Sequence, residues 1–149
     1  MKRLIGIAGL AGMAGLSGCG ITGFMDREAV VTEPSPCVTK RFEIYFADSE
    51  ARLTESARRA IGLEAAQLQG CDIRRVQVLG LADARGGATA NLSLSERRAQ
   101  AVAEALTAAG WPAPAFDVDA AGDEGAVTEA GVREPMRRRT EVLVEAVPR

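Results

Sequence analysis

Two charged residues, Asp83 and Arg98, raise the first question about chemistry in this chain of 149 residues. Asp83 lies in a loop with Gly86 and Gly87 close behind it, and these glycines allow a close backbone approach. Arg98 lies fifteen residues later, on the side of a predicted helix that carries the non-polar residues. A guanidinium there needs an anion inside the fold, a groove near the helix start, or a route to water. Asp83 and Arg98 could therefore pair with each other, or contact opposite ends of one zwitterionic ligand.

The helix that positions Arg98 is predicted from a start signal and from the spacing of its non-polar residues. Residues 93–96, Ser-Leu-Ser-Glu, fit a capping box in which the Ser93 hydroxyl accepts from the backbone and Glu96 reaches back. The predicted helix therefore begins at Leu94 and ends near Ala109, where a glycine follows. Its inward stripe, at spacings of three and four, comprises Leu94, Arg98, Val102, Ala105 and Ala109.

The other elements are predicted from alternation and from helix signals. Alternating or densely non-polar segments predict four strands, at residues 41–46, 73–79, 116–120 and 140–146. A first helix is predicted from about Glu55 to Gln69, because Thr54 is a suitable cap. The order β-α-β-α-β-β predicts an α/β fold, a two-layer sandwich with a mixed four-stranded sheet.

The first eighteen residues are typical of an export signal. Lys2 and Arg3 precede thirteen uncharged residues, 4–16. A membrane-spanning helix needs roughly 18 to 20 non-polar residues, so this segment is too short to span a bilayer. We expect it to be a signal peptide that is removed.

Residues 16–19, Leu-Ser-Gly-Cys, resemble the lipobox of bacterial lipoproteins, in which the cysteine is lipidated and becomes the mature N-terminus. The resemblance implies that Cys19 carries acyl chains such as palmitate, and several chains together anchor a protein durably. Gly20, in place of an aspartate after the cysteine, favours the outer membrane. The alternative is an ordinary cleaved signal followed by an incidental cysteine.

The expected organisation therefore has three parts. Residues 1–18 form a lipoprotein signal peptide, residues 19–39 form the lipidated N-terminus and a flexible linker with two prolines, and residues 40–149 form one domain.

The signal contains two of the 18 Lys and Arg and none of the 20 Asp and Glu, so the mature chain has a net charge of −4. This balance does not suggest a nucleic-acid partner, which requires a basic face. The chain has no histidine, which excludes histidine triads and histidine metal sites, and we expect no metal and no cofactor.

The two remaining cysteines, Cys37 and Cys71, are candidates for a disulfide. An exported protein lies in an oxidising compartment, and each cysteine stands a few residues before a predicted strand. The alternative is two separate reduced thiols, which exported proteins usually avoid. We therefore expect a Cys37–Cys71 disulfide.

Three motifs resemble the C-terminal peptidoglycan-binding domain of the OmpA family. They are Gly80-Leu81-Ala82-Asp83, Asn91 with Leu94-Ser95-Glu96-Arg97-Arg98-Ala99, and Gly131-Val132-Arg133-Glu134-Pro135-Met136-Arg137-Arg138-Arg139. The family pattern is Gly-His-Thr-Asp, then Asn, then Leu-Ser-x-x-Arg-Ala, then Asn-Arg-Arg-Val. The resemblance covers about residues 41–147, nearly all of the predicted domain.

The resemblance implies a role for each matching residue. Asp83 would bind the free amino group of diaminopimelate in the peptidoglycan stem peptide, and Arg98 would bind its carboxylate. Asn91 would help to shape the pocket and Arg138 would lie close to the ligand, whereas Arg139 would face the other way at the start of the last strand. The chain departs from the family pattern at four positions, Leu81, Ala82, Arg137 and Thr140.

The resemblance and the leader together imply a non-enzymatic tether between the outer membrane and the cell wall, with the domain facing the periplasm. An alternative is an envelope protein-interaction module with a degenerate peptidoglycan pocket, which Leu81 and Ala82 favour. The peptidoglycan-associated lipoprotein resembles this chain in architecture and has partners in the Tol system, so Tol proteins are candidate partners. An enzyme is the least expected of the three, because the acids Glu43, Asp48 and Glu50 at one strand end are typical of solvated charge.

Overall fold

The computed structural model describes residues 35–149, so Cys19 and the predicted signal peptide lie outside the described residues. Strands and helices follow in the predicted order β-α-β-α-β-β, with two short 3-10 helices, η1 and η2, in the later loops. The elements are β1 (Lys40–Tyr45), α1 (Glu55–Gln67), β2 (Cys71–Gly80), α2 (Ala88–Ala108), η1 (Ala113–Ala115), β3 (Phe116–Ala120), η2 (Pro135–Arg137) and β4 (Arg139–Pro148).

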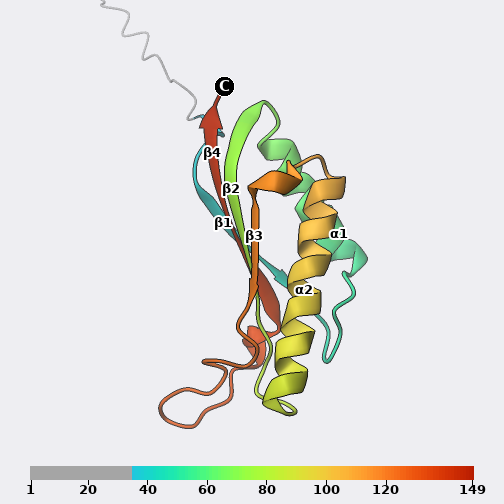
Figure 1. Ribbon diagram of the computed structural model, residues 1–149, viewed down its shortest axis with the longest axis vertical. Helices are drawn as coiled ribbons and strands as arrows, with labels where there is room; N and C mark the ends of the chain where they lie inside the picture. Colours follow the sequence, from blue (N-terminus) through green and yellow to red (C-terminus); the bar gives the residue numbers. More distant parts are fainter. Residues whose placement is uncertain (1–34) are drawn as a thin grey trace, which may run out of the picture. The chain divides into compact units, whose positions relative to one another are not determined.

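The four strands form one sheet in the order β1-β4-β2-β3. Strand β4 is antiparallel to both β1 and β2, whereas β3 is parallel to β2. Both helices of the described chain lie on the same face of this sheet (Figure 1). The predicted two-layer α/β sandwich with a mixed four-stranded sheet is therefore confirmed.

Alternation along the central strands builds the core between the sheet and the helices. In β4, Thr140, Val142 and Val144 are fully buried, and the side chains between them are more exposed. Val76 and Val78 of β2 are buried on the same face. Valine suits these positions because its branched side chain packs well on a pleated surface.

Helix α1 begins as the sequence predicts. The Thr54 hydroxyl accepts a hydrogen bond from the backbone N–H of Ala57 at 3.1 Å, which caps the first turn. The helix ends at Gln67, two residues before the predicted end, and Gly70 follows with a φ of 85°. That left-handed conformation suits glycine, which has no Cβ.

Helix α2 begins six residues earlier than the capping box predicts. Gly87 caps it without a side chain, and the backbone N–H of Asn91 donates to the Gly87 carbonyl at 3.0 Å. The Ser93 capping box is therefore wrong, because Ser93 lies inside the helix and its hydroxyl accepts from the Arg97 side chain instead. The inward stripe is also shifted: Leu94 and Ala105 are only half-buried and Ala109 is exposed, whereas the buried residues are Asn91, Ser95, Arg98, Ala99, Val102, Ala103 and Leu106.

A close contact between Gly80 and Ser95 sets the position of α2 on the sheet. A Cβ added to Gly80 would lie 2.0 Å from the Ser95 carbonyl oxygen, which no side chain could occupy. The Ser95 hydroxyl donates to the Leu92 carbonyl at 2.7 Å and accepts from the backbone N–H of Gly122 at 3.0 Å. Ser95 therefore joins α2 to the loop that follows β3.

Cys37 and Cys71 form a disulfide, as the sequence predicts. Their Cα atoms lie 5.4 Å apart, and the bridge joins the segment before β1 to the first residue of β2. Cys71 is buried, and Cys37 packs partly buried against the core. The disulfide therefore ties one residue of the predicted linker to the sheet.

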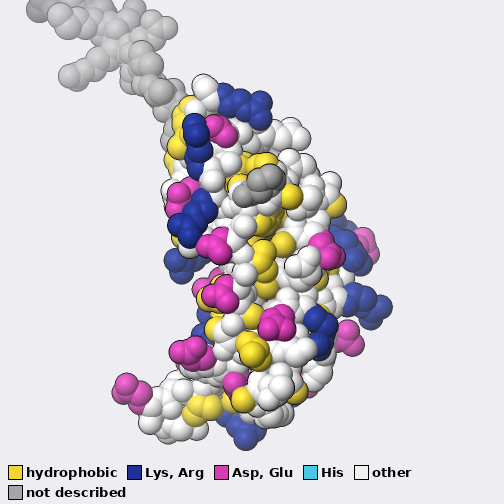
Figure 2. Space-filling model, in the orientation of Figure 1, with side chains coloured by type: hydrophobic (Ala, Val, Ile, Leu, Met, Phe, Trp, Pro, Cys, Tyr) yellow, Lys and Arg dark blue, Asp and Glu magenta, His cyan; other side chains and the backbone are white. Residues whose placement is uncertain are grey.

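The seam between β3 and α2 is covered incompletely. Figure 2 shows hydrophobic side chains gathered along this seam. Ala103 and Ala108 of α2 and Phe116 and Val118 of β3 line a shallow groove there. Val118 is 43% exposed, which is common for a residue of an edge strand.

Candidate functional site

Arg98 is the largest fully buried side chain of the described residues, with 0% of its surface exposed. Its guanidinium donates to three backbone carbonyls rather than to a carboxylate. Nε donates to Glu50 at 2.8 Å, Nη1 to Leu81 at 2.9 Å, and Nη2 to Ala47 at 3.3 Å. These bonds account for three of the five N–H groups of an arginine.

The three carbonyls belong to two loops at the same end of the sheet. Ala47 and Glu50 lie between β1 and α1, and Leu81 lies between β2 and α2. The buried side chain of Arg98 therefore links both loops to helix α2. Phe46 adds a favourable contact, because its ring centroid lies 5.2 Å from the guanidinium carbon. Burial lowers the pKa of the Arg98 guanidinium, and the nearby Asp83 carboxylate opposes this shift.

Asp83 lies near Arg98, but its ion pairs among the described residues are with two other arginines. Its Oδ2 atom is 3.5 Å from Nη1 of Arg138 and 3.8 Å from Nε of Arg85. Only 9% of the Asp83 side chain is exposed. Both distances exceed the usual length of a charged hydrogen bond, about 2.7 to 2.9 Å, so the carboxylate is surrounded by cations without a close contact. The direct Asp83–Arg98 pair that the sequence left open does not form.

Arg85 connects Asp83 to the neighbouring loop. Its Nη1 atom lies 2.6 Å from Oδ2 of Asp48, while its Nε faces Asp83. Arg85 was not among the predicted site residues, and Asp48 was predicted to be a solvated charge at a strand end. The only signal for this contact is the position of Arg85 two residues after Asp83, which does not specify a partner in another loop.

Arg138 and Arg139 point to different places, as alternation at the start of β4 predicts. Arg138 faces Asp83 and keeps 26% of its side chain exposed. Arg139 pairs with Glu141 at 2.7 Å and with Glu43 at 3.3 Å, both outside the Asp83 site. Arg137, which replaces the asparagine of the family pattern, donates to the Glu124 carbonyl.

Asn91 supports the site from behind the loop. It lies in the first turn of α2, is 3% exposed, and its amide donates to Oδ2 of Asp123 at 2.9 Å. A Cβ on Gly86 would lie 3.5 Å from Oδ1 of Asn91, so the loop passes close to the amide. Asn91 therefore connects the loop before α2 with the loop after β3.

Leu81 and Ala82 are buried and contribute backbone contacts. The N–H of Leu81 donates to the Arg139 carbonyl at 2.9 Å, and the N–H of Ala82 donates to the Gly122 carbonyl at 2.7 Å. Their side chains carry no hydrogen-bonding group, unlike the histidine and threonine of the family pattern. The backbone at these two positions thus fixes the loop, whereas their side chains add no donor beside Asp83.

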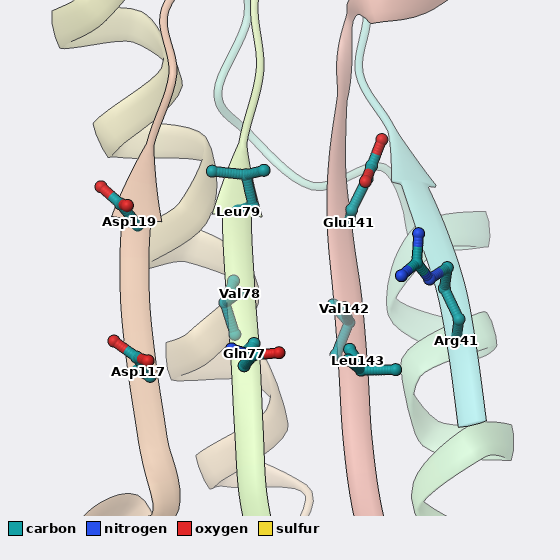
Figure 3. Close-up of a pocket in the computed structure, with 9 residues that line it drawn as sticks. All are labelled: Arg41, Gln77, Val78, Leu79, Asp117, Asp119, Glu141, Val142 and Leu143. Atoms are coloured by element: carbon teal, nitrogen blue, oxygen red, sulfur yellow. The ribbon is translucent and has the colours of Figure 1, made fainter. Parts of the chain in front are cut away.

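A separate hollow of about 240 Å³ lies on the face of the sheet away from the helices (Figure 3). Figure 3 shows Asp117 and Asp119 on β3 and Glu141 on β4, with Leu79 of β2 between them and Leu143 of β4 beside Arg41 of β1. The hollow does not include Asp83 or Arg98. It is therefore a second surface, acidic and partly non-polar.

In residues 35–149, no group of three Cys, Asp or Glu side chains is arranged to hold a metal ion.

Within that same part of the chain, no helix has the length and non-polar character required to cross a membrane.

Comparisons with known proteins agree with this architecture. Outer membrane protein A from Yersinia pseudotuberculosis serotype I is 36% identical over 102 residues, which are 64% of this chain and 29% of the relative. The chain thus spans less than a third of the length of this relative.

Three solved structures share the fold. The OmpA-like domain of FopA1 from Francisella tularensis is 26% identical with a TM-score of 0.62, over 74% of this chain and 73% of that one. The cell wall anchor of the T6SS from Pseudomonas aeruginosa is 27% identical with a TM-score of 0.59, over 73% and 82%. The peptidoglycan-associated lipoprotein from Burkholderia pseudomallei is 24% identical with a TM-score of 0.58, over 70% and 90%, and shows the fold alone.

The match to the family extends from the end of β1 to the start of β4, residues 45–140, and includes Asp83, Asn91, Arg98 and Arg138. It covers more than half of the chain, and the fold and the relatives agree with it. This chain belongs to the OmpA family.

Proposed function

We propose that residues 40–149 form a non-enzymatic module that binds peptidoglycan noncovalently through the diaminopimelate of the stem peptide. The observation that carries the proposal is that a carboxylate, Asp83, and an inward guanidinium, Arg98, share one site without pairing with each other. A carboxylate and a guanidinium that are not paired with each other can bind the two opposite charges of a zwitterion.

Asp83 receives the ligand ammonium in this proposal. Its ion pairs with Arg85 and Arg138 are 3.8 and 3.5 Å long, and an ammonium could approach the carboxylate more closely than either arginine does. The carboxylate is largely buried, so a contact there is screened less by water than a contact on the open surface.

Arg98 receives the ligand carboxylate in this proposal, and Nη2 is the donor that would bind it. Its bond to the Ala47 carbonyl is the longest of the three, at 3.3 Å, and Ala47 itself is exposed. A carboxylate could replace this carbonyl while Nε and Nη1 keep their bonds to Glu50 and Leu81. Arg138 then lies beside the ligand, and Asn91 holds the loop that carries Asp83.

The anchor completes the proposed role. A signal peptide at residues 1–18, lipidation of Cys19 and a linker would hold the domain at the outer membrane, facing the periplasm. One solved relative supports a role at the wall by its name, the cell wall anchor of the T6SS from Pseudomonas aeruginosa. The chain would then tether the outer membrane to peptidoglycan.

A second candidate function is the docking of envelope proteins, including those of the Tol system. The hollow on the open face of the sheet favours it, because Leu79 and Leu143 offer non-polar surface there among charged side chains, three acids and Arg41. The absence of a side-chain donor at Leu81 and Ala82 would weaken peptidoglycan binding and favours the same alternative.

Sedimentation with isolated sacculi tests the proposal. Residues 20–149, with the disulfide oxidised, are incubated with diaminopimelate-type sacculi and the bound fraction is measured beside Asp83→Asn. Loss of the charge should weaken binding at least about tenfold, because a charged hydrogen bond contributes about 1.5 to 3 kcal/mol. Asp117→Asn is the matched control, since Asp117 is exposed and pairs with Arg75 on the open face of the sheet.

The outcomes separate the two candidate functions. Binding by the parent and by Asp117→Asn, with loss in Asp83→Asn, supports peptidoglycan recognition. A folded parent that does not sediment, but retains an envelope protein through Leu79 and Leu143, favours the docking role.

A further inference from the structure

Asp83 and four charged side chains around it do not balance in charge. Arg85, Arg98 and Arg138 are positive, and Asp48 and Asp83 are negative, and we call these five residues the Asp83 cluster. The cluster has a net charge of +1. A ligand ammonium on Asp83 would raise the local charge to +2, so two ligand carboxylates are needed to balance it.

Arg98 accounts for one of these carboxylates, and Arg85 is the best placed to take the other. Its guanidinium lies between Asp83 and Asp48, and 57% of its side chain is exposed. Arg138 is less suitable, because only 26% of its side chain is exposed. A group bound on Asp83 would therefore have Arg85 as its exposed cationic neighbour.

The Asp48 partner of Arg85 is readily exchanged. Both side chains are more than half exposed, and exposed pairs of this kind contribute little to stability. A ligand carboxylate held nearby by the rest of the cluster would compete with Asp48 at high effective concentration. The exchange keeps Arg85 paired throughout.

From this geometry we infer that Arg85 is a second carboxylate-binding residue, so that the ligand carries one ammonium and two carboxylates. This inference rests on the proposed function and deepens it, because it specifies the charge pattern of the ligand. A stem peptide whose second carboxyl group is amidated is then a poorer ligand than one in which it is free.

Two small probes isolate the second carboxylate. Nα-acetyl-diaminopimelate offers one ammonium and two carboxylates, whereas its α-carboxamide keeps the ammonium with its adjacent carboxylate and lacks the second. Binding of both probes to oxidised residues 20–149 is measured by isothermal titration calorimetry. The parent should prefer the dicarboxylate about fivefold, the size expected for one exposed charge pair.

The Arg85→Gln variant should bind both probes equally and keep the parent's affinity for the carboxamide. Arg74→Gln is the matched control, because Arg74 forms a similar exposed pair with Asp72 near the other end of β2. That control should keep the preference.

Each other outcome is decisive. A parent that binds both probes equally, or an Arg85→Gln variant that keeps the preference, overturns the role of Arg85 and leaves the proposed function intact. A folded parent that binds neither the probes nor sacculi overturns the proposed function, and the inference falls with it.

Discussion

At the scale of single residues, Arg98 is held in the interior by backbone carbonyls. Three carbonyls from two loops accept from its guanidinium, and none of them belongs to a charged group. Lysine could not reproduce this contact, because its ammonium is one point at the end of a flexible chain, whereas a guanidinium presents a planar fork.

Arg98→Lys should therefore lower the free energy of unfolding by at least about 2 kcal/mol, because hydrogen bonds to charged groups contribute about 1.5 to 3 kcal/mol and buried carbonyls lose their partners. Urea unfolding followed by circular dichroism measures the change. Arg97→Lys, an exposed position on the same helix, should change stability by less than about 0.5 kcal/mol. Equal effects of the two substitutions would contradict the proposed linking role of Arg98.

Thr140 occupies a position where the family pattern has valine. It is fully buried, and its Oγ1 atom has no hydrogen-bond partner among the described residues. Thr140→Val should raise the free energy of unfolding by about 1 kcal/mol, because an unsatisfied buried hydroxyl is removed without loss of volume. Thr107→Val is the control, since the Thr107 hydroxyl donates to the Ala103 carbonyl and the residue is exposed. A loss of stability in Thr140→Val would refute this explanation.

Part of the residue-scale description could be predicted from the sequence. Helical spacing predicted that Arg98 faces inward, and the need for a partner followed from its charge. The partners themselves could not be predicted, because backbone carbonyls have no residue identity. The Arg85–Asp48 pair was missed for a related reason: its two members lie 37 residues apart in two loops, and no sequence period relates them.

At the scale of elements, the contact between α2 and β2 determines where Asp83 and Arg98 lie. Gly80 admits the helix backbone at Ser95, and the Ser95 hydroxyl holds the N–H of Gly122. The loop of Asp83 starts at this contact, so a shift of the helix would change the distance between the two proposed ligand groups.

Ser95→Ala should lower the free energy of unfolding by about 1 to 3 kcal/mol, since it leaves the buried N–H of Gly122 without its partner.

Ser93→Ala tests the rejected capping box on the same helix. A helix that began at Leu94 would lose about 1 kcal/mol with Ser93, whereas the observed start at Ala88 predicts almost no change. Chemical denaturation of both variants distinguishes the two helix starts, and the opposite order of effects would contradict the structure.

The strands were easier to predict than this helix start. Every second residue of β4 is buried against the helices, so non-polar and polar residues alternate along the strand and predict it. No comparable sequence pattern marks the start of α2, because Gly87 caps the helix without a side chain and the Ser95 hydroxyl bonds to the distant Gly122. Residues 93–96 therefore match the capping-box pattern although they lie inside the helix and do not cap it.

At the scale of the whole molecule, the disulfide closes a loop that contains β1 and α1. Cys37 and Cys71 are 34 residues apart in the sequence. Reduction should lower the free energy of unfolding by about 3 to 4 kcal/mol, because the unfolded chain regains the entropy of the open loop. Urea unfolding with and without reductant measures this loss. A Cys37→Ser/Cys71→Ser variant should be insensitive to reductant, and an unchanged parent would contradict the proposed contribution.

The whole architecture followed from the sequence because its signals are distributed over the entire domain. The order of elements, the mixed sheet and the pairing of Cys37 with Cys71 were predicted correctly. Lipidation of Cys19 and the parts of the chain before residue 35 remain predictions, which mass spectrometry of the mature N-terminus would test.

A nuclear magnetic resonance titration tests peptidoglycan recognition by Asp83 and Arg98 directly. Oxidised, ¹⁵N-labelled residues 20–149 are titrated with a soluble muropeptide that contains diaminopimelate. The backbone amides of residues 81–85 and of Ala47 and the Nε resonance of Arg98 should shift, with little change at Gln77, Asp119 and Leu143 on the open face. Shifts confined to the open face, or none at saturating concentration, would contradict peptidoglycan recognition by Asp83 and Arg98.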